Sequence, residues 1–158
     1  MYSFVNDQEF IEKRNNGQYH VFRSLSLVTP TWEDLSFEFN RCLMEKDQLK
    51  IFENFGFVLH TAENIPHVES VLREYSKCDP NLSASAHCYI SFLPFSRTFE
   101  EHTDNTDVLY WQCAGEVKWV VQGNEYILKP NDAVYVPKNM KHYALPFTPR
   151  FGISLGLD

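Results

Sequence analysis

Apolar and polar residues alternate with two different periods along this chain, and the change between them falls near residue 80. A helical face repeats every three to four residues, whereas a strand alternates at every second residue. Before residue 80 both periods occur, and after it nearly every apolar run is short and extended. The pattern therefore predicts helices with flanking strands at about residues 1–80, followed by a β-rich core at about residues 84–157.

The N-terminal half is expected to contain helices mixed with short strands. The middle helix has the clearest start, because Thr31 is a good N-cap and Glu33 and Asp34 place acidic side chains in the first turn. In the first helix, Asn6 or Asp7 provides the cap. The expected helices are Val5–Asn15, Thr31 to about Lys46 and Pro66–Lys77, and the expected strands are His20–Ser26 and Phe55–Thr61.

The second half consists of short predicted strands separated by turn residues. The predicted strands are Ser85–Leu93, Val108–Ala114, Val117–Gln122, Glu125–Leu128, Ala133–Val136, His142–Leu145 and Phe151–Leu157. Turns are expected at Gly115, Gly123-Asn124, Pro130-Asn131-Asp132 and Pro137–Asn139. Many short strands at even spacing are typical of a barrel or a double-sheet jelly roll. We therefore expect one domain, residues 1–158, mainly β with an N-terminal helical elaboration.

Composition excludes several classes of function. The chain has 158 residues, of which 44% are hydrophobic, so it can bury a core. Its net charge is −7 and no stretch is basic, which argues against nucleic acid as a partner. With only 6 glycines and no Gly-rich fingerprint, the nucleotide-binding loops that need glycine are excluded.

The chain opens in polar sequence, with neither a cationic leader nor a long apolar run. We therefore expect a cytoplasmic protein that does not insert into a membrane. The cysteines show no Cys-x-x-Cys spacing, and in that compartment they are expected to be reduced thiols. They are Cys42, Cys78, Cys88 and Cys113.

One short motif, His102-Thr103-Asp104, is a candidate for metal chemistry. Alternate residues of an extended segment point to the same side, so His102 and Asp104 can face a barrel mouth together. His142 follows the predicted strand Ala133–Val136 and the turn after it. In a jelly roll that strand can return beside the first one, which would bring both imidazoles and the carboxylate to one metal ion.

Two imidazoles and one carboxylate suit Fe(II) and leave three coordination positions open for reagents. Zinc is the alternative for the same ligand set. Each histidine could instead be an ordinary surface or hydrogen-bonded core residue. The remaining histidines, His20, His60, His67 and His87, have no comparable context and are assigned no role.

The two motifs around these residues resemble the JmjC-type hydroxylases of the cupin superfamily, in particular the ribosomal-oxygenase and asparaginyl-hydroxylase branch. The first similar stretch runs from His102 to Val108 and continues in Gln112, Gly115 and Trp119, and the second runs from Leu128 to Pro137 and ends in His142. Further similarity lies in Tyr89–Pro94, Phe99 and Trp32-Glu33-Asp34-Leu35. The resemblance covers about residues 85–145 well and the N-terminal half loosely.

This resemblance implies a double-stranded β-helix that uses Fe(II), with 2-oxoglutarate and O₂ as cosubstrates. It also implies that His102, Asp104 and His142 are the metal ligands and form the catalytic centre. The substrate to be hydroxylated would be a protein side chain or a small molecule, and a homodimer is compatible with the family.

The chain departs from the family pattern at two positions. Asn131 replaces a turn glycine, which is a small change because asparagine tolerates a left-handed turn. Val117 stands where the family branch usually has the lysine or arginine that pairs with the distal carboxylate of 2-oxoglutarate. The neighbouring Lys118 has the opposite strand parity and should face away.

Arg150 is the natural replacement, because Arg150 and Ser154 resemble the arginine and hydroxyl residue that bind this carboxylate in prolyl-hydroxylase-like oxygenases. The planar fork of arginine holds a carboxylate through two hydrogen bonds. Ser154 and Tyr89 are further candidates for hydroxyl contacts. Tyr110, Trp111 and Trp119 are expected in the core.

The leading function from sequence is Fe(II)- and 2-oxoglutarate-dependent hydroxylation. Two other classes stay open. One is a metal cupin that does not use 2-oxoglutarate, such as a dioxygenase or an isomerase, which Val117 favours. The other is a non-catalytic cupin binding module, which the intact His102, Asp104 and His142 oppose.

Overall fold

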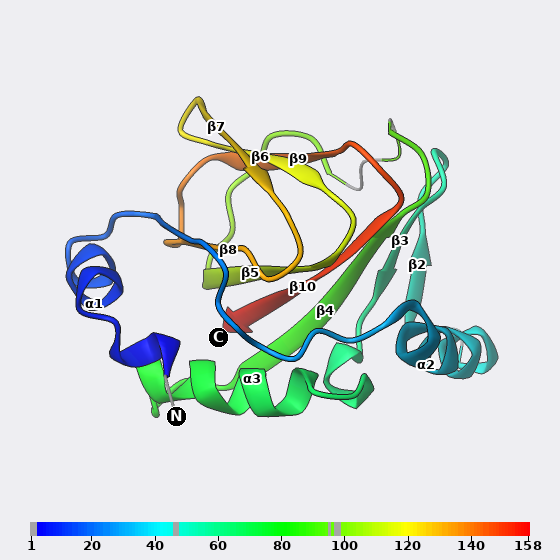
Figure 1. The fold of residues 1–158 in the computed structure, drawn as a ribbon, viewed down its shortest axis with the longest axis horizontal. Helices are drawn as coiled ribbons and strands as arrows, with labels where there is room; N and C mark the ends of the chain where they lie inside the picture. Colours follow the sequence, from blue (N-terminus) through cyan, green and yellow to red (C-terminus); the bar gives the residue numbers. More distant parts are fainter. Residues whose placement is uncertain (1–2, 46–47, 95, 97–98) are drawn as a thin grey trace.

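The strands of this computed structural model form two antiparallel sheets. The model describes residues 3–45, 48–94, 96 and 99–158. The strands are β1 (His20–Phe22), β2 (Leu49–Ile51), β3 (Gly56–Leu59), β4 (Ala84–Ser91), β5 (Asp107–Ala114), β6 (Val117–Val121), β7 (Asn124–Leu128), β8 (Ala133–Val136), β9 (His142–Pro146) and β10 (Arg150–Leu157). The large sheet has the order β1-β8-β5-β10-β4-β3-β2, and the small sheet has the order β7-β6-β9. The two sheets face each other and enclose a barrel-like interior (Figure 1). This arrangement confirms the predicted jelly-roll, double-stranded β-helix fold.

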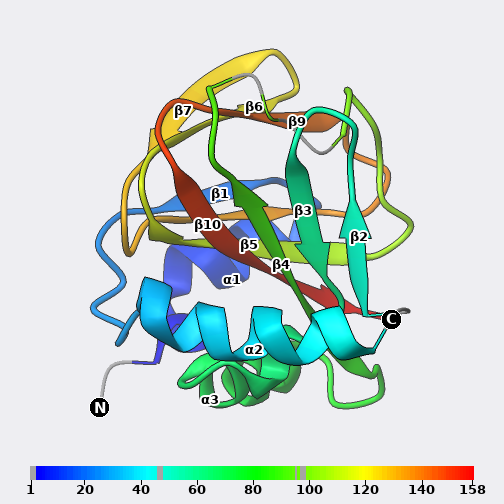
Figure 2. The same ribbon diagram turned by 90° about the vertical axis from the view of Figure 1, so that its right-hand side faces the viewer.

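The helices cover the outer face of the large sheet (Figure 2). They are α1 (Gln8–Asn15), α2 (Trp32–Met44) and α3 (Val68–Tyr75), with short 3₁₀ turns at Phe4–Asn6, Ala62–Asn64 and Ser76–Cys78. Thr31 and Asp34 form a capping box at the start of α2, as the sequence indicates. Within the described residues, none of the helices combines the length and the apolar character that crossing a membrane requires.

Strand alternation divides the apolar residues between two cores. On β5, Leu109 and Trp111 point to the helices and join the larger core. Tyr110 points the other way, into the space between the sheets, where it meets Val117 and Trp119 of β6. The expectation that Tyr110, Trp111 and Trp119 lie in the core is therefore confirmed, with Trp111 in the larger core and Tyr110 and Trp119 in the core between the sheets.

Several predicted boundaries were wrong. The first predicted helix is divided in two, because Asp7 interrupts it and caps α1 by accepting a hydrogen bond from the Phe10 backbone N–H at 3.0 Å. The strand predicted to reach Ser26 ends at Phe22, and both Ser24 and Ser26 have positive φ angles that end extended pairing. The predicted end of α2 near Lys46 lies outside the described residues.

Candidate active site

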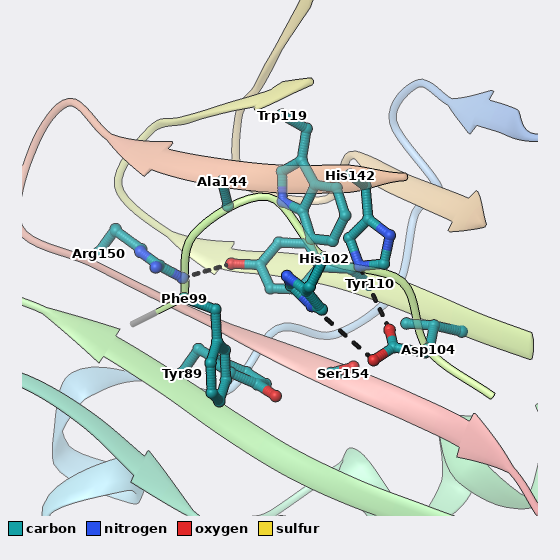
Figure 3. A pocket seen from close by; sticks show the side chains of 11 residues that line it. Tyr89, Phe99, His102, Asp104, Tyr110, Trp119, His142, Ala144, Arg150 and Ser154 are labelled. Atoms are coloured by element: carbon teal, nitrogen blue, oxygen red, sulfur yellow. Dashed lines mark hydrogen bonds and ion pairs between the residues drawn. The ribbon is translucent and has the colours of Figure 1, made fainter. Parts of the chain in front are cut away.

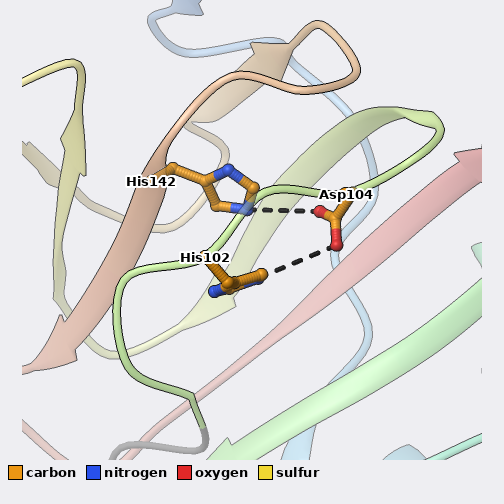
Figure 4. A group of neighbouring side chains, drawn as sticks. All are labelled: His102, Asp104 and His142. Atoms are coloured by element: carbon orange, nitrogen blue, oxygen red, sulfur yellow. Dashed lines mark ion pairs between the residues drawn. The ribbon is translucent and has the colours of Figure 1, made fainter.

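His102, Asp104 and His142 are brought together by a backbone contact between the two motifs. His102 lies just before β5, and His142 is the first residue of β9. Their backbones form a two-way bridge, with N–H to O distances of 3.1 Å from His102 and 3.0 Å from His142. The backbone N–H of Asn139 also donates to the carbonyl of Asp104 at 2.7 Å. As a result, the potential ligand atoms of the three side chains lie within 4.8 Å of one another (Figure 4).

Both imidazoles present the same nitrogen to the centre of this cluster. The Nδ1 atoms lie 2.8 Å from the Glu100 carbonyl and 2.9 Å from the Met140 carbonyl, respectively. A carbonyl oxygen only accepts, so the hydrogen-bond network assigns a hydrogen to each Nδ1. Each Nε2 then faces Asp104, at 3.8 Å from His102 and 3.2 Å from His142. This orientation suits metal ligation, in which the other ring nitrogen donates to a carbonyl.

The cluster is half open to its surroundings. The side chain of His142 is 4% exposed, whereas those of His102 and Asp104 are 35% and 34% exposed. The close contact with the His142 imidazole holds the pKa of Asp104 below its usual value, although partial burial acts in the opposite direction. A carboxylate that stays ionised is an oxygen ligand for a divalent cation, and the open side leaves room for reagents.

Aromatic rings fix the two histidines from outside the cluster. Trp119 stacks on the His142 ring with a centroid distance of 5.3 Å and an interplanar angle of 13°. Phe99 packs against the His102 ring at 5.4 Å. Such neighbouring contacts hold ligand rings in one orientation and keep water from one side of a metal site.

The cluster lies at one end of a pocket between the two sheets (Figure 3). The pocket opens to the surface and contains about 440 Å³ of empty space, its open mouth included. Its lining residues are Tyr89, Phe99, His102, Asp104, Val108, Tyr110, Trp119, His142, Ala144, Arg150 and Ser154.

Arg150 lies at the opposite side of this pocket and is 1% exposed. In the part of the chain that the structure describes, no carboxylate forms an ion pair with it. Its Nη1 donates to the Tyr110 hydroxyl at 2.9 Å, and its buried Nε has no partner among the described residues. An uncompensated buried charge costs about 3–5 kcal/mol, so this guanidinium calls for an anionic ligand.

A chain of hydrogen bonds holds Arg150 without neutralising it. The Gln112 amide nitrogen donates to the carbonyls of Ala114 and Gly115 at 2.7 and 3.0 Å, which leaves its Oε1 to accept. The Tyr110 hydroxyl donates to that Oε1 at 2.7 Å, and its oxygen therefore accepts from Arg150. Burial raises the pKa of Tyr110 to about 12, so the phenol stays protonated and contributes no negative charge at neutral pH.

Because Gly152 has no side chain, it leaves room for the Tyr110 ring in this series of hydrogen bonds. A Cβ atom built on Gly152 would collide with the Tyr110 hydroxyl and Cζ and would lie 2.9 Å from the Trp111 carbonyl oxygen. Gly156, on the same face of β10, is less constrained, since its Cβ would meet Ser85 Oγ at 3.3 Å and Thr106 Oγ1 at 3.8 Å.

The remaining sequence candidates occupy the positions that strand parity indicates. Ser154 and Tyr89 line the pocket, and burial raises the pKa of Tyr89, which keeps its hydroxyl protonated. Val117 is fully buried in the interior cluster. Lys118 faces outward and pairs with Glu125 at 3.0 Å. Sequence reasoning did not identify Tyr110, Gln112 and Trp119 as site residues. The signal that could have found them is strand parity, since Tyr110 and Gln112 lie two residues apart on β5 and Trp119 lies two residues after Val117 on β6.

Comparisons with known proteins support the fold through similar solved structures and not through similar sequences. No family profile matches the chain, and no curated protein is detectably similar in sequence. The ribosomal oxygenase YcfD from Escherichia coli, solved in complex with cobalt and 2-oxoglutarate, matches with a TM-score of 0.78 and 15% identity over 97% of this chain and 51% of that one. KdgF from Halomonas sp. matches with a TM-score of 0.51 and 16% identity over 72% and 89% of the two chains.

These matches define the class of fold. The chain has the same double-stranded β-helix fold as these two solved structures, which confirms the fold that the resemblance in the sequence motifs implied. It spans about half the length of the YcfD chain. With this fold it combines a cluster of two histidines and one aspartate that could hold a metal ion.

The three clustered side chains should bind one divalent metal. We expect His142→Ala and Asp104→Ala to abolish stoichiometric binding of Fe(II) or Co(II), because each removes one of three ligands. The measurement is metal content after gel filtration. His60→Ala, which removes a half-buried histidine outside the cluster, should bind like wild type. Full metal occupancy in His142→Ala would show that the cluster is not the site.

Gly152 should tolerate no side chain. We expect Gly152→Ala to lower the free energy of unfolding by about 1–3 kcal/mol, the usual cost of overpacking, because Tyr110 must move. Gly156→Ala, the matched change on the same face of β10, should cost clearly less. Urea unfolding of both variants is the measurement, and equal losses would contradict the assigned role of Gly152.

Proposed function

We propose that this protein is an Fe(II)- and 2-oxoglutarate-dependent oxygenase that hydroxylates a C–H bond of a protein side chain or a small molecule. The observation that carries the proposal is the pairing, in one pocket, of a His-His-Asp cluster with a buried arginine that lacks an anion. The cluster suits a metal, and the arginine suits the distal carboxylate of an oxo-acid bound to that metal.

His102, Asp104 and His142 would hold the metal through two Nε2 atoms and one carboxylate oxygen. Fe(II) with 2-oxoglutarate and O₂ supplies an oxidation in which the oxo-acid becomes succinate and CO₂ and one oxygen atom enters a C–H bond. The protein's part is to orient the ligand rings, as the Glu100 and Met140 carbonyls and the Trp119 ring do.

Arg150 would bind the distal carboxylate, with Ser154 and Tyr89 as hydroxyl neighbours. The chain from Gln112 through Tyr110 holds the guanidinium on the pocket wall and leaves its charge unpaired. Arg150 thereby takes the role that the family branch gives to the position of Val117. The YcfD structure in complex with cobalt and 2-oxoglutarate supports the choice of ligands, because its fold matches this chain.

One observation favours a second candidate, a metal cupin that does not use 2-oxoglutarate. Val117 is apolar and fully buried, so β6 offers no cation to the oxo-acid. In that case Arg150 would bind a different anionic substrate beside the metal.

The purified protein loaded with Fe(II) should bind 2-oxoglutarate and convert it to succinate. Under anaerobic conditions we expect a visible charge-transfer band when 2-oxoglutarate is added, because chelation by the oxo-acid creates this transition. In air, slow succinate formation should follow, and His102→Ala should abolish both signals. If the iron-loaded wild type neither binds nor decarboxylates 2-oxoglutarate, the metal-cupin alternative replaces this proposal.

Arg150→Ala should weaken 2-oxoglutarate binding by roughly ten- to a hundredfold, because a charge-assisted hydrogen bond contributes about 1.5–3 kcal/mol. Arg150→Lys should recover little, since an ammonium group lacks the bidentate fork. Titration of the charge-transfer band gives the dissociation constants. Lys118→Ala removes the outward-facing cation of β6 and serves as the control that should bind normally. Unchanged affinity in Arg150→Ala would exclude Arg150 as the carboxylate anchor.

A further inference from the structure

The pocket contains a second buried N–H group without a partner. Among the described residues, seven side-chain polar atoms are buried without a hydrogen-bond partner: Ser3 Oγ, Arg14 Nε, Glu74 Oε1, Tyr75 OH, Ser91 Oγ, Trp119 Nε1 and Arg150 Nε. Of these seven, Trp119 and Arg150 alone belong to residues that line the pocket. Both groups can only donate a hydrogen bond. Buried donors are nearly always paired, so two in one pocket indicate a ligand that accepts from both.

The indole of Trp119 lies between the His-His-Asp cluster and the Arg150 side of the pocket. It lies on β6 opposite Ala144 of β9, and it is 5% exposed. Its ring stacks on His142, and its centroid is 4.8 Å from that of Tyr110. Figure 3 shows the six-membered ring on the His142 side and the indole nitrogen on the side of Ala144 and Arg150. The N–H group therefore faces the same end of the pocket as the guanidinium.

The guanidinium of Arg150 and the indole N–H of Trp119 together favour a carboxylate as the ligand. A positive guanidinium needs a negative partner, and two separate N–H donors need two oxygen lone pairs. A carboxylate meets both needs with its two oxygens, whereas a neutral carbonyl leaves the charge uncompensated. The Tyr110 hydroxyl already uses its hydrogen on Gln112, so it offers the ligand no further donor.

We propose that Trp119 is a direct binding residue for this carboxylate, its indole N–H donating to one oxygen while Arg150 holds the other. The identification of the ligand as 2-oxoglutarate rests on the proposed function, whereas the carboxylate site rests on the two donors. Val117 and Trp119 share the interior face of β6, because they are two residues apart. The indole N–H of Trp119 thus gives β6 a neutral hydrogen-bond donor to the carboxylate. It stands in for the cation that the family branch has at the position of Val117.

Indole N–H resonances test this assignment without turnover. The chain has three tryptophans, and the N–H of Trp111 is already paired with Asn131 at 3.3 Å. In the ¹⁵N-labelled, metal-free protein, titration with succinate should shift the Trp119 indole resonance downfield and saturate it. The resonances of Trp32 and Trp111 should move little. Succinamide, which has the same length without charge, should cause no saturable shift, and Trp119→Phe assigns the signal by deleting it.

The same titration should measure the contribution of the N–H group. Trp119→Phe keeps an aromatic ring beside His142 and removes the donor, so we expect about tenfold weaker binding of succinate and of 2-oxoglutarate, as for the loss of one hydrogen bond to a charged group. Trp32→Phe is the matched control, because Trp32 packs on Phe92 and Phe151 outside the pocket, and it should bind like wild type. Circular dichroism of Trp119→Phe should match that of the wild type, so that a loss of affinity is not caused by unfolding.

The outcomes separate this inference from the proposed function. A carboxylate that binds without moving the Trp119 resonance, or with equal affinity in Trp119→Phe, overturns the role of Trp119 and leaves the oxygenase proposal standing. The absence of any saturable shift also overturns it. A Trp119 shift in a protein whose iron-loaded form does not decarboxylate 2-oxoglutarate supports the carboxylate site and rejects the oxygenase function.

Discussion

The candidate site depends on one backbone contact, the two-way hydrogen bonding between His102 and His142. It links the segment before β5, in the large sheet, with the start of β9, in the small sheet. Because the bridge sets the spacing of the two backbones, it also sets the distance between the imidazoles, whose centroids are 4.5 Å apart. Asp104 is held to the same place by the Asn139 amide. The three side chains are therefore brought together by backbone geometry, and such preorganisation would lower the cost of binding a metal ion.

The second constraint is electrostatic. Arg150 is buried, its one hydrogen bond among the described residues goes to the neutral Tyr110 hydroxyl, and no described carboxylate forms an ion pair with it. Other contacts must offset the free-energy cost of this buried charge, among them the tight packing of Gly152 against Tyr110. Natural proteins tolerate such local cost mainly at functional sites. In this pocket a bound carboxylate would recover part of that cost, which couples ligand binding to stability.

If Arg150 is the carboxylate anchor, as proposed, the same fold would hold one ligand from two different strands. The resemblance to the family branch places the cation at the position of Val117 in the small sheet, whereas Arg150 would approach the carboxylate from β10 in the large sheet. Val117 then completes the apolar interior with Leu128 and Val121. The ring of Trp119 lies beside the His-His-Asp cluster, and its indole N–H has no hydrogen-bond partner among the described residues.

The sequence by itself determined the features that follow from local periodicity and capping. The start of α2 at Thr31, the strands from β4 to β10 and the shared direction of His102 and Asp104 all depend on residues close together in the chain. It did not reveal β2, because Leu49–Ile51 is only three residues long and is extended through its pairing with β3. The tertiary structure alone decided that Tyr110 and Trp119 border a ligand pocket and that Arg150 and Trp119 keep unpaired N–H groups. Whether a donor is satisfied depends on every strand that packs around it, and those contacts join residues far apart in sequence.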